Sequence, residues 1–484
     1  MSILVVDVGT SSVRAALVRG DATIAHEERR PLLPASPAPG VVEFDAAEMA
    51  ATVLDAARAV VAAADGTGDA IDAVGIANQR GSTIVWDRAT GEPVGPGIGW
   101  QDLRTVGRCL ELRGEGLRFA PNVSATKLEH LLDVADPDRD RDLCFGTVDT
   151  WVAWTLSEGA VHVTDASNAA ITGLLESDAG AWFDDALNML RVPARVLPRV
   201  VDSTGVVGAA TALPGAPPIA GLAGDQQASL LGQGGVHTGG AKITFGTGAM
   251  LDLVIGAERP EFHTRGPGGT YPIVCRRVRG LDTWGVEAIM LSAGTNVEWL
   301  RDDLGVIATT AESHDVASEC ESTGDVWYVP ALLGLGTPRW DYGARGTVLG
   351  LTRGTGRPEL VRAVLEGIAH RGVDLVEAAE GDTGIAVPCL RVDGGMTANA
   401  TFVQLLADAA QRIVEVAPVL EATALGAAFL AGLAVGTWES EDDLAATWAP
   451  RTRVDPRQHL DRERWHEACH RAEHWIPDLS AVDF

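Results

Sequence analysis

The sequence predicts an α/β protein built from two related domains. A strand–turn–strand pattern occurs twice, as ILVVDVGTSSVRAALV at residues 3–18 and as AKITFGTGAMLDLVI at residues 241–255. Each copy is followed by alternating runs that fit strands and helices, which is typical of mixed sheets flanked by helices. The chain of 484 residues is also too long for a single hydrophobic core. We expect one domain at residues 1–232 and a second at residues 233–484.

The composition is that of a folded globular protein. Hydrophobic residues make up 46% of the chain and charged residues 21%, and the net charge is −28. Because nucleic-acid backbones attract positive surfaces, this charge argues against a nucleic-acid partner. The six cysteines form no CxxC pair, so their spacing indicates neither a disulfide framework nor a zinc site.

The sequence gives no sign of a membrane association. The N-terminus lacks a basic region followed by a long apolar run, so no signal peptide is expected. The longest uncharged stretch, residues 422–438, is rich in Ala and Gly and fits a buried helix better than a membrane span. We expect a cytoplasmic protein with no membrane partner.

The first half is expected to open with strands. They lie at residues 3–8, 13–19 and 22–28, and a proline-rich connector follows at 31–39. Asp45, with Glu48 three residues later, predicts a capped helix that runs to about residue 64. Buried strands at 71–77 and 83–86 and a turn at 87–93 come next.

The second half is expected to begin after a glycine-rich crossing at residues 221–240. Helices are predicted near 288–303, at 358–380, from about 399 and from about 421, and a strand at 389–392 leads into Gly394-Gly395. A glycine pair between strand and helix lets a flat ring or a phosphate approach the backbone. Residues 439–484 are expected to form amphipathic helices that pack on the second domain.

The two turns carry the first chemical signal. The apex Gly9-Thr10-Ser11-Ser12 offers backbone N–H groups and hydroxyls to one anion, as a phosphate site requires. Asp7 enters that turn and could hold Mg²⁺ beside the phosphate, or it could be a buried turn former. The second turn, Phe245–Gly248, has no such acid. The pattern suggests two half-molecules that face a shared nucleotide.

Lysine is nearly absent, which excludes one common phosphate loop. The chain has only Lys127 and Lys242, a scarcity attributed to the bias of the encoding genome, and neither is followed by Ser or Thr. The GxxxxGK[ST] motif is therefore missing. A phosphoryl-transfer enzyme with this sequence needs another phosphate cradle.

Three further residues are candidates for an acceptor site. Asp225 lies in the glycine-rich crossing and could receive a hydroxyl proton, although spacing alone favours an exposed loop aspartate that caps a helix. Arg80 follows a buried strand and could bind substrate oxygens or lie on the surface. Trp100 could lie against a carbon skeleton, but a core position is the commoner role for an isolated Trp.

Taken together, these segments resemble the FGGY carbohydrate kinases. The likeness runs from about residue 3 to residue 438 and rests on VVDVGTSSVRA, ANQRGSTIVWDRATGEPV, GLAGDQQASL, ITFGTGAM, LRVDGGMTAN and EATALGAAFLAGLAVG. The C-terminal family signature is intact from Gly346 through Glu366. The resemblance implies two actin-like, ribonuclease-H-like domains with an interdomain active-site cleft for ATP, Mg²⁺ and a small polyol or sugar.

The resemblance also implies a role for individual residues. Asp225 would be the catalytic base and Asp7 the metal-side carboxylate. The residues expected at the nucleotide are Thr10, Ser11, Ser12, Arg14, Thr247, Gly294, Glu298, Gly395 and Asn399. Those expected at the acceptor are Arg80, Gly81, Trp100, Asn122, Asp225 and Gln226.

Departures from the pattern bear on the acceptor. Within the family the chain is most similar to the enzymes that phosphorylate glycerol, which carry Glu at Gly81, Tyr at Asn122 and an aromatic residue at about Met250. Each lost contact with an acceptor hydroxyl lowers the binding free energy by about 0.5–1.5 kcal/mol. The missing side chain at Gly81 is also expected to leave extra volume in the acceptor site. Glycerol, converted to glycerol 3-phosphate, is the leading candidate, and erythritol, xylitol, xylulose and ribulose are alternatives.

Two other functional classes share parts of the pattern. An actin- or chaperone-like ATPase switch would use the same turns, but only about 46 residues follow the last motif, too few for a peptide-binding domain. A catalytically idle sugar sensor is disfavoured by the presence of Asp7, Arg80 and Asp225. A homo-oligomer, either a dimer or a tetramer, is expected.

Overall fold

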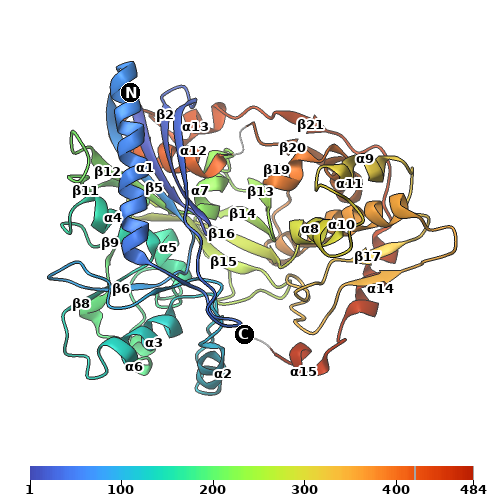
Figure 1. Cartoon of the computed structure of the whole chain (residues 1–484), viewed down its shortest axis with the longest axis horizontal. Helices are drawn as coiled ribbons and strands as arrows, with labels where there is room; N and C mark the ends of the chain where they lie inside the picture. The colour runs from blue at the N-terminus through green and yellow to red at the C-terminus, as the bar shows by residue number, and fades with distance from the viewer. Residues whose placement is uncertain (419–420, 483–484) are drawn as a thin grey trace.

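The computed structural model describes residues 1–418 and 421–482 and consists of two α/β halves (Figure 1). The half formed by the first part of the chain lies on the left of that view, with α1 along its outer side. The half that carries α10 and α11 lies on the right. The two-domain α/β architecture expected from the sequence is confirmed.

The first half contains one six-stranded sheet and several short strands. Its strands are β1 (Ser2–Val8), β2 (Ser12–Arg19), β3 (Ile24–Pro31), β4 (Glu43–Phe44), β5 (Ile71–Asn78), β6 (Ile84–Asp87), β7 (Gly97–Ile98), β8 (Leu143–Gly146), β9 (Val163–Asp165), β10 (Arg199–Val201), β11 (Thr204–Ala209) and β12 (Pro218–Gly224). The sheet order is β11-β12-β5-β1-β2-β3. β1 is antiparallel to β2 and parallel to β5.

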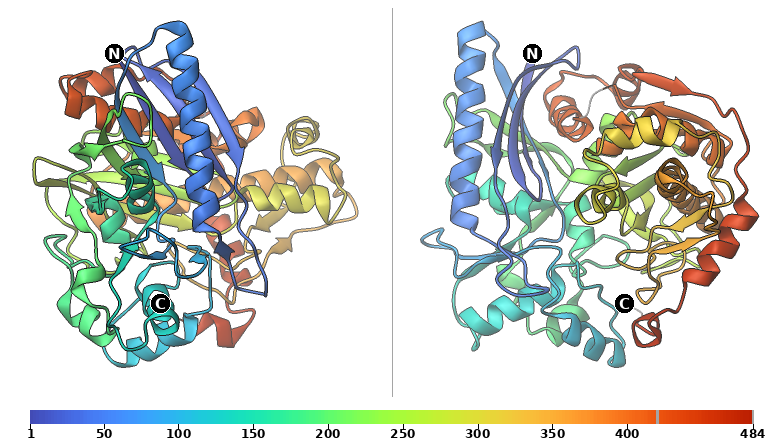
Figure 2. Two further views of the ribbon diagram at one scale, coloured as in Figure 1. Left: turned by 60° about the vertical axis from the view of Figure 1, so that its left-hand side comes forward. Right: turned by 45° about the vertical axis from the view of Figure 1, so that its right-hand side comes forward.

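The helices of this half are α1 (Ala46–Thr67), α2 (Val106–Gly114), α3 (Ala125–Ala135), α4 (Val148–Leu156), α5 (Ala166–Ile171), α6 (Asp184–Met189) and α7 (Asp225–Gly232), with a 3₁₀ turn at Ala194–Val196. Helices α1 and α4 belong to the cluster on one face of the six-stranded sheet and α7 to the cluster on the other, whereas α2, α3 and α6 form a separate cluster around β6 and β8. Alternate residues of β1 point to opposite faces. Leu4 and Val6 pack with α1 on the outer face (Figure 2), whereas Ile3 and Val5 pack on the inner face with α7.

The second half repeats this sheet topology. Its strands are β13 (Ala241–Phe245), β14 (Ala249–Gly256), β15 (Tyr271–Val278), β16 (Leu281–Met290), β17 (Trp327–Val329), β18 (Thr347–Leu349), β19 (Cys389–Asp393), β20 (Ile413–Val416) and β21 (Thr452–Val454). The main sheet has the order β15-β16-β14-β13-β19-β20-β21. β13 is antiparallel to β14 and parallel to β19, as β1 is to β2 and β5. The two halves therefore share one strand plan.

The helices of the second half are α8 (Gly294–Asp302), α9 (Glu312–Ser318), α10 (Arg357–Thr383), α11 (Ala400–Ala410), α12 (Ala422–Val435), α13 (Glu441–Ala446), α14 (Arg462–Ala472) and α15 (Pro477–Ser480), with a 3₁₀ turn at Gly395–Ala398. Helices α8, α9, α10 and α11 contribute to the cluster that covers one face of the main sheet. Phe245 of β13, Leu365 of α10 and Phe402 of α11 belong to the largest buried cluster.

Helix α12 instead crosses to the first half. It packs on the inner face of the first sheet, beside β5, β12 and α7. Glycines make this close approach possible: a Cβ at Gly75 would lie 2.4 Å from the Ala427 carbonyl oxygen, and one at Gly426 would lie 1.8 Å from the Ala228 carbonyl oxygen. The C-terminal part of the chain thus ties the halves together. The division at residues 232/233 stays a prediction.

Several expected elements differ from the structure. The helix expected at 288–303 is wrong in its first part, because β16 continues to Met290 and α8 begins only at Gly294. The third strand starts at Ile24 rather than at residue 22. Asp45 caps α1 as expected, since its side chain accepts hydrogen bonds from the backbone N–H of Ala47 and Glu48.

The C-terminal region also differs in part. Trp465 of α14 packs on the second half with Val329 and Leu335, as expected, whereas Leu444 of α13 joins the cluster around α12. Within the described parts of the chain, no helix combines the length and the apolar character needed to cross a membrane.

Candidate active site

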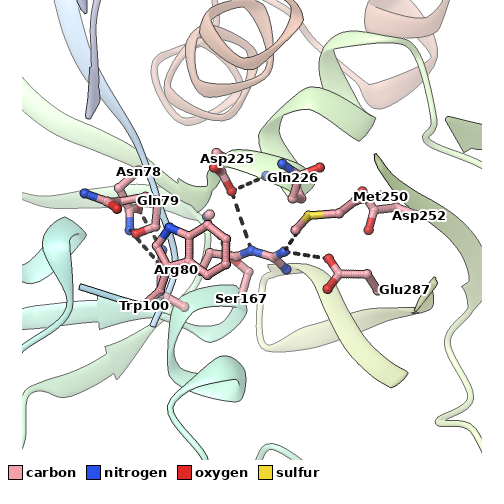
Figure 3. A network of polar contacts seen from close by, with 12 residues as sticks. Asn78, Gln79, Arg80, Trp100, Ser167, Asp225, Gln226, Met250, Asp252 and Glu287 are labelled. Atoms are coloured by element: carbon pink, nitrogen blue, oxygen red, sulfur yellow. Dashed lines mark hydrogen bonds and ion pairs between the residues drawn. The ribbon is translucent and has the colours of Figure 1, made fainter. Parts of the chain in front are cut away.

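Polar side chains from both halves meet between the two sheets (Figure 3). Arg80 follows the end of β5, and Asp225 and Gln226 open α7. Met250 of β14 and Glu287 of β16 approach from the second half. Four of the predicted acceptor residues therefore lie together in this region. They are Arg80, Trp100, Asp225 and Gln226.

Arg80 connects the two halves. Its Nε lies 3.5 Å from Asp225 Oδ1, and its Nη2 donates to Glu287 Oε2 at 2.6 Å. The same nitrogen lies 3.9 Å from the sulfur of Met250. The Arg80 side chain is only 8% exposed, so the alternative of a surface arginine is wrong. Its Nη1 is buried without a hydrogen-bond partner and is a free donor for an acceptor oxygen.

Asp225 has the environment of a proton acceptor. It is the first residue of α7, directly after the N-cap Gly224, and its Oδ1 accepts the backbone N–H of its neighbour Gln226 at 2.8 Å, so Asp225 lies at the helix start but is not its cap. Burial raises the pKa of Asp225, although the charges of Arg80 and Lys242 act in the opposite direction. A raised pKa makes the carboxylate a stronger base near neutral pH.

A row of buried charges lies beneath this group. Lys242, Asp252 and Glu287 occupy paired positions on β13, β14 and β16. Lys242 Nζ lies 2.9 Å from Asp252 Oδ2, and both side chains are fully buried. Burial raises the pKa of Glu287 to about 7, while Arg80 opposes the shift. Sequence reasoning missed this row, although the rarity of lysine could have drawn attention to Lys242.

The first turn is built as predicted and also contacts Trp100. Gly9 donates its N–H to the Ser12 carbonyl oxygen at 3.0 Å and closes the turn. Trp100 donates its indole N–H to Thr10 Oγ1 at 3.2 Å, and Arg29 donates to Ser12 Oγ at 3.1 Å. Trp100 is half-buried, so it is not a core residue. Its side chain lies between Thr10 of the turn and the acceptor residues around Arg80.

Asp7 is placed where a cation would neutralise it. Burial raises the pKa of Asp7 to about 7; Arg14, whose Nη1 lies 3.8 Å away, opposes the shift, and Asp225 adds to it. Arg14 itself also pairs with Glu27 at 3.1 Å and with Glu421. The negative charges of Asp7 and Asp225 repel each other. Carboxylates in such a pair are suitable ligands for a divalent cation.

The second turn brings Thr247 and Gly294 together. Gly246 and Gly248 close the turn through a 2.9 Å hydrogen bond, and Gly294 donates its N–H to the Gly246 carbonyl oxygen at 2.9 Å. A Cβ at Gly294 would lie 2.6 Å from that oxygen, so only glycine fits there. The N-terminus of α8 is thereby fixed against the turn, with Glu298 exposed further along the helix.

The glycine pair after β19 borders the same turn. Gly394 has φ +89°, and a Cβ there would lie 2.3 Å from the Phe245 carbonyl oxygen, whereas Gly395 faces open space. Asn399 caps α11 by accepting the N–H of Phe402 at 3.0 Å, and its amide donates to Ser313 Oγ at 2.9 Å. Gly395 and Asn399 lie at the two ends of the same 3₁₀ turn, and their place at the nucleotide stays a prediction.

Asp393 at the end of β19 is a further residue that sequence reasoning missed. Burial raises its pKa, while Lys242 and the hydroxyls of Thr244 and Ser229 oppose the shift; the Ser229 Oγ donates to Asp393 Oδ2 at 3.0 Å. The residue stands in the quoted segment LRVDGGMTAN, directly before the glycine pair. A buried acid in front of two glycines was the available signal.

The expectation that Gly81 vacates volume is wrong. Gly81 has φ +73°, and a Cβ there would lie 2.4 Å from the Asn122 carbonyl oxygen. The backbone of the 120–124 loop therefore fills the space beside Gly81. Fully buried Lys127 holds this loop, since its Nζ donates to the carbonyl oxygens of Trp100 at 3.1 Å and Asn122 at 3.2 Å. The Asn122 side chain itself is exposed.

Comparison with known proteins places this geometry in one family. The N-terminal domain model of the FGGY family of carbohydrate kinases matches residues 2–232, and the C-terminal domain model matches residues 241–435. The chain is 41% identical to a glycerol kinase of Aromatoleum aromaticum over 98% of this chain and 99% of the relative. It is 39% identical to one of Thermus thermophilus, with 95% of each chain covered.

Solved structures agree. A glycerol kinase of Plasmodium falciparum with ADP superimposes with a TM-score of 0.91 at 28% identity, over 100% of this chain and 99% of that one. A xylulose kinase of Rhodospirillum rubrum shares the fold, with a TM-score of 0.83 at 24% identity over 97% of this chain and 98% of that one. The chain therefore belongs to the FGGY family of carbohydrate kinases and is an ATP-dependent kinase.

Proposed function

We propose that the enzyme transfers the γ-phosphoryl group of ATP to a primary hydroxyl of glycerol, giving glycerol 3-phosphate and ADP. The observation that carries the proposal is the pairing of Asp225 with Arg80 between the two halves. It sets the proposed proton acceptor, Asp225 Oδ1, 3.5 Å from Nε of a buried arginine. The printed names of the full-length relatives agree with a glycerol acceptor.

In the proposed reaction, Asp225 accepts the hydroxyl proton as the oxygen attacks the γ-phosphorus. The new O–P bond forms while the bond between the γ-phosphorus and the bridging oxygen breaks, and ADP leaves with the electron pair. Arg80 binds an acceptor oxygen through its free Nη1 and orients the alcohol. Trp100, tied to Thr10, lies beside the carbon skeleton.

The nucleotide is proposed to lie across the two turns. The Thr10–Ser12 turn and Arg14 would contact the phosphates from the first half. Thr247 and Gly294 would contact them from the second half, and Glu298, Gly395 and Asn399 would lie near the adenosine end. N–H groups that point at a transferred phosphoryl group stabilise the charge that develops on it.

Asp7 is the proposed ligand for Mg²⁺. Burial, with a further contribution from the charge of Asp225, raises the pKa of Asp7 to about 7, and a cation at this position would favour the ionised carboxylate. When bound, Mg²⁺ supplies charge neutralisation on the phosphate oxygens.

The filled space at Gly81 favours a small acceptor. The Asn122 carbonyl oxygen lies where a side chain at position 81 would begin, so no extra room is present there for a longer sugar. A bound acceptor would, however, lose one contact, because position 81 is Gly here and carries no carboxylate, whereas the related enzymes have Glu at this position. A charged hydrogen bond contributes about 1.5–3 kcal/mol, so we expect a high KM for glycerol.

A panel of acceptors tests the proposal. ADP release would be measured for glycerol, erythritol, xylitol, xylulose and ribulose, with a blank that contains no acceptor. We expect glycerol to give the highest kcat/KM by at least about tenfold, a difference of about 1.4 kcal/mol in transition-state binding. A higher value for a pentose or pentitol would refute the glycerol assignment. ADP release that ignores every acceptor would support an ATPase switch instead.

Two sequence-based expectations remain predictions. The first is a homo-oligomeric state, and the second is a cytoplasmic location. Size-exclusion chromatography with light scattering would measure the first, and fractionation of the host cell would measure the second.

A further inference from the structure

Lys242 is a buried cation that contacts three side chains of the protein. Its Nζ donates to Gln226 Oε1 at 2.6 Å and to Thr244 Oγ1 at 2.8 Å, and it forms an ion pair with Asp252 Oδ2 at 2.9 Å. An ammonium group has three N–H donors and no acceptor. Because the Lys242 side chain is fully buried among these partners, it does not reach a substrate directly.

The contact with Lys242 fixes the orientation of the Gln226 amide. A primary amide has one oxygen and one NH₂ group, and only the oxygen can face an ammonium. Because Lys242 holds Oε1 on the sheet side, Nε2 points away from the sheet. Gln226 is partly exposed and directly follows Asp225, so its NH₂ group is available beside the proposed base.

Burying the Lys242–Asp252 ion pair costs free energy of folding, which suggests that the pair has a function. Burying an ion pair requires removing two charges from water, and hydrophobic replacements are often as stable or more stable. Lys242 and Asp252 are nonetheless both fully buried in a sheet that otherwise offers apolar positions, such as Ile243 and Leu251. Lys242 has two neutral partners, Thr244 and Gln226, and Gln226 belongs to the predicted acceptor site.

We propose that Lys242 is a positioning residue that holds Gln226 with its NH₂ group toward the acceptor, so that Gln226 donates a hydrogen bond to an acceptor hydroxyl oxygen. The inference rests on the proposed function, because it assigns a contact to the same acceptor. Asp252 and Thr244 keep Lys242 in place, and the acceptor oxygen receives donors from both Arg80 and Gln226.

A double-mutant cycle on kcat/KM for glycerol tests the proposal. Lys242→Met with Asp252→Asn removes the ammonium without leaving an unpaired buried carboxylate, and Gln226→Ala removes the amide. Each change is expected to lower kcat/KM about tenfold, the loss of one hydrogen bond. All three changes together are expected to cause no further loss, since both routes remove the same contact. KM for ATP should stay within about twofold.

A second variant tests the donor role if the buried replacements fail to fold. In Gln226→Glu one carboxylate oxygen still faces Lys242, but the other cannot donate. The fold should be kept, and kcat/KM for glycerol should fall as far as in Gln226→Ala. Wild-type kcat/KM in Gln226→Glu would overturn the proposal.

Other outcomes separate this inference from the proposed function. Losses that multiply to about a hundredfold in the combined variant would show that Lys242 and Gln226 act independently and would overturn it. A matched control removes a pair at the far end of the same sheet, Arg277→Met with Asp282→Asn, whose Nε–Oδ1 distance is 2.7 Å. A similar loss in this control would show general loosening and would also overturn it. Absence of acceptor-dependent ADP release in the wild type would refute the proposed function itself.

Discussion

The two strand–turn–strand units have the same topology but place their acids differently. In the first, Asp7 lies two residues before Gly9 on β1; in the second, Thr244 occupies the corresponding place before Gly246 on β13. The second half has its acid on the neighbouring parallel strand instead, as Asp393, directly opposite Thr244. One strand plan thus carries two arrangements of charge.

The difference indicates a division of labour. Asp7 lies beside Asp225 and partly faces solvent, with a side chain that is 14% exposed, so it can reach a bound cation. Asp393 is buried, accepts from Ser229 and faces Lys242, so it belongs to the internal framework. The first half therefore carries the proposed transfer chemistry, and the second half carries the glycines that approach the nucleotide.

The largest effect is expected when the corresponding residues before the two turns, Asp7 and Thr244, are replaced and the two variants are compared. Asp7→Asn removes the proposed metal ligand and should lower kcat by about a thousandfold, the upper range for one electrostatic group. Thr244→Val at the corresponding place removes only one of three contacts of Lys242 and should cost less than about tenfold. Steady-state kinetics at saturating Mg²⁺ measures both. Equal losses in the two variants would contradict the proposed division.

The paired glycines give a smaller and more specific effect. Gly81 and Gly394 both have positive φ and follow strands that lie parallel to β1 and β13. Alanine at either position meets a carbonyl oxygen and adopts a disfavoured backbone, at about 1–2 kcal/mol for the backbone alone. Gly81→Ala should raise KM for glycerol about tenfold, and Gly394→Ala should raise KM for ATP by a similar factor. A rise in the same KM for both variants would count against the assignment of Gly81 to the acceptor site and of Gly394 to the nucleotide site.

The smallest expected effect concerns stability. Because folding raises the pKa of Asp7 from 3.8 to about 7, ionisation of Asp7 weakens the ion-free protein progressively as pH rises from about 4 to 7. Asp7→Asn should therefore have a higher melting temperature than the wild type at pH 8, with a smaller difference at pH 5. Thermal unfolding without Mg²⁺ measures it. A difference that is larger at pH 5 would contradict the raised pKa.

The repeated fold was predictable because it depends on local patterns. Apolar runs, glycine turns and the cap at Asp45 each specify structure over a few residues. The helix expected at 288–303 failed where an apolar run of a few residues fits a strand or a helix equally well, and the pairing of β16 with β14 decides between them.

The site was less predictable because its partners are far apart in the chain. The row Lys242, Asp252 and Glu287 arises from strand register, which no single segment encodes. The space beside Gly81 is filled by the backbone carbonyl oxygen of Asn122, which lies some 40 residues later in the chain. A sequence shows that a side chain is missing, but only the structure shows what occupies its place.

The central claim is that Asp225 receives the proton of the acceptor hydroxyl. Acceptor-dependent ADP release by Asp225→Asn, measured together with ATP binding by calorimetry, tests it most directly. The account predicts a fall in kcat of about a hundredfold to ten-thousandfold, the contribution of a general base, with the Kd for ATP within about threefold of the wild type. Turnover within about tenfold of the wild type would contradict it.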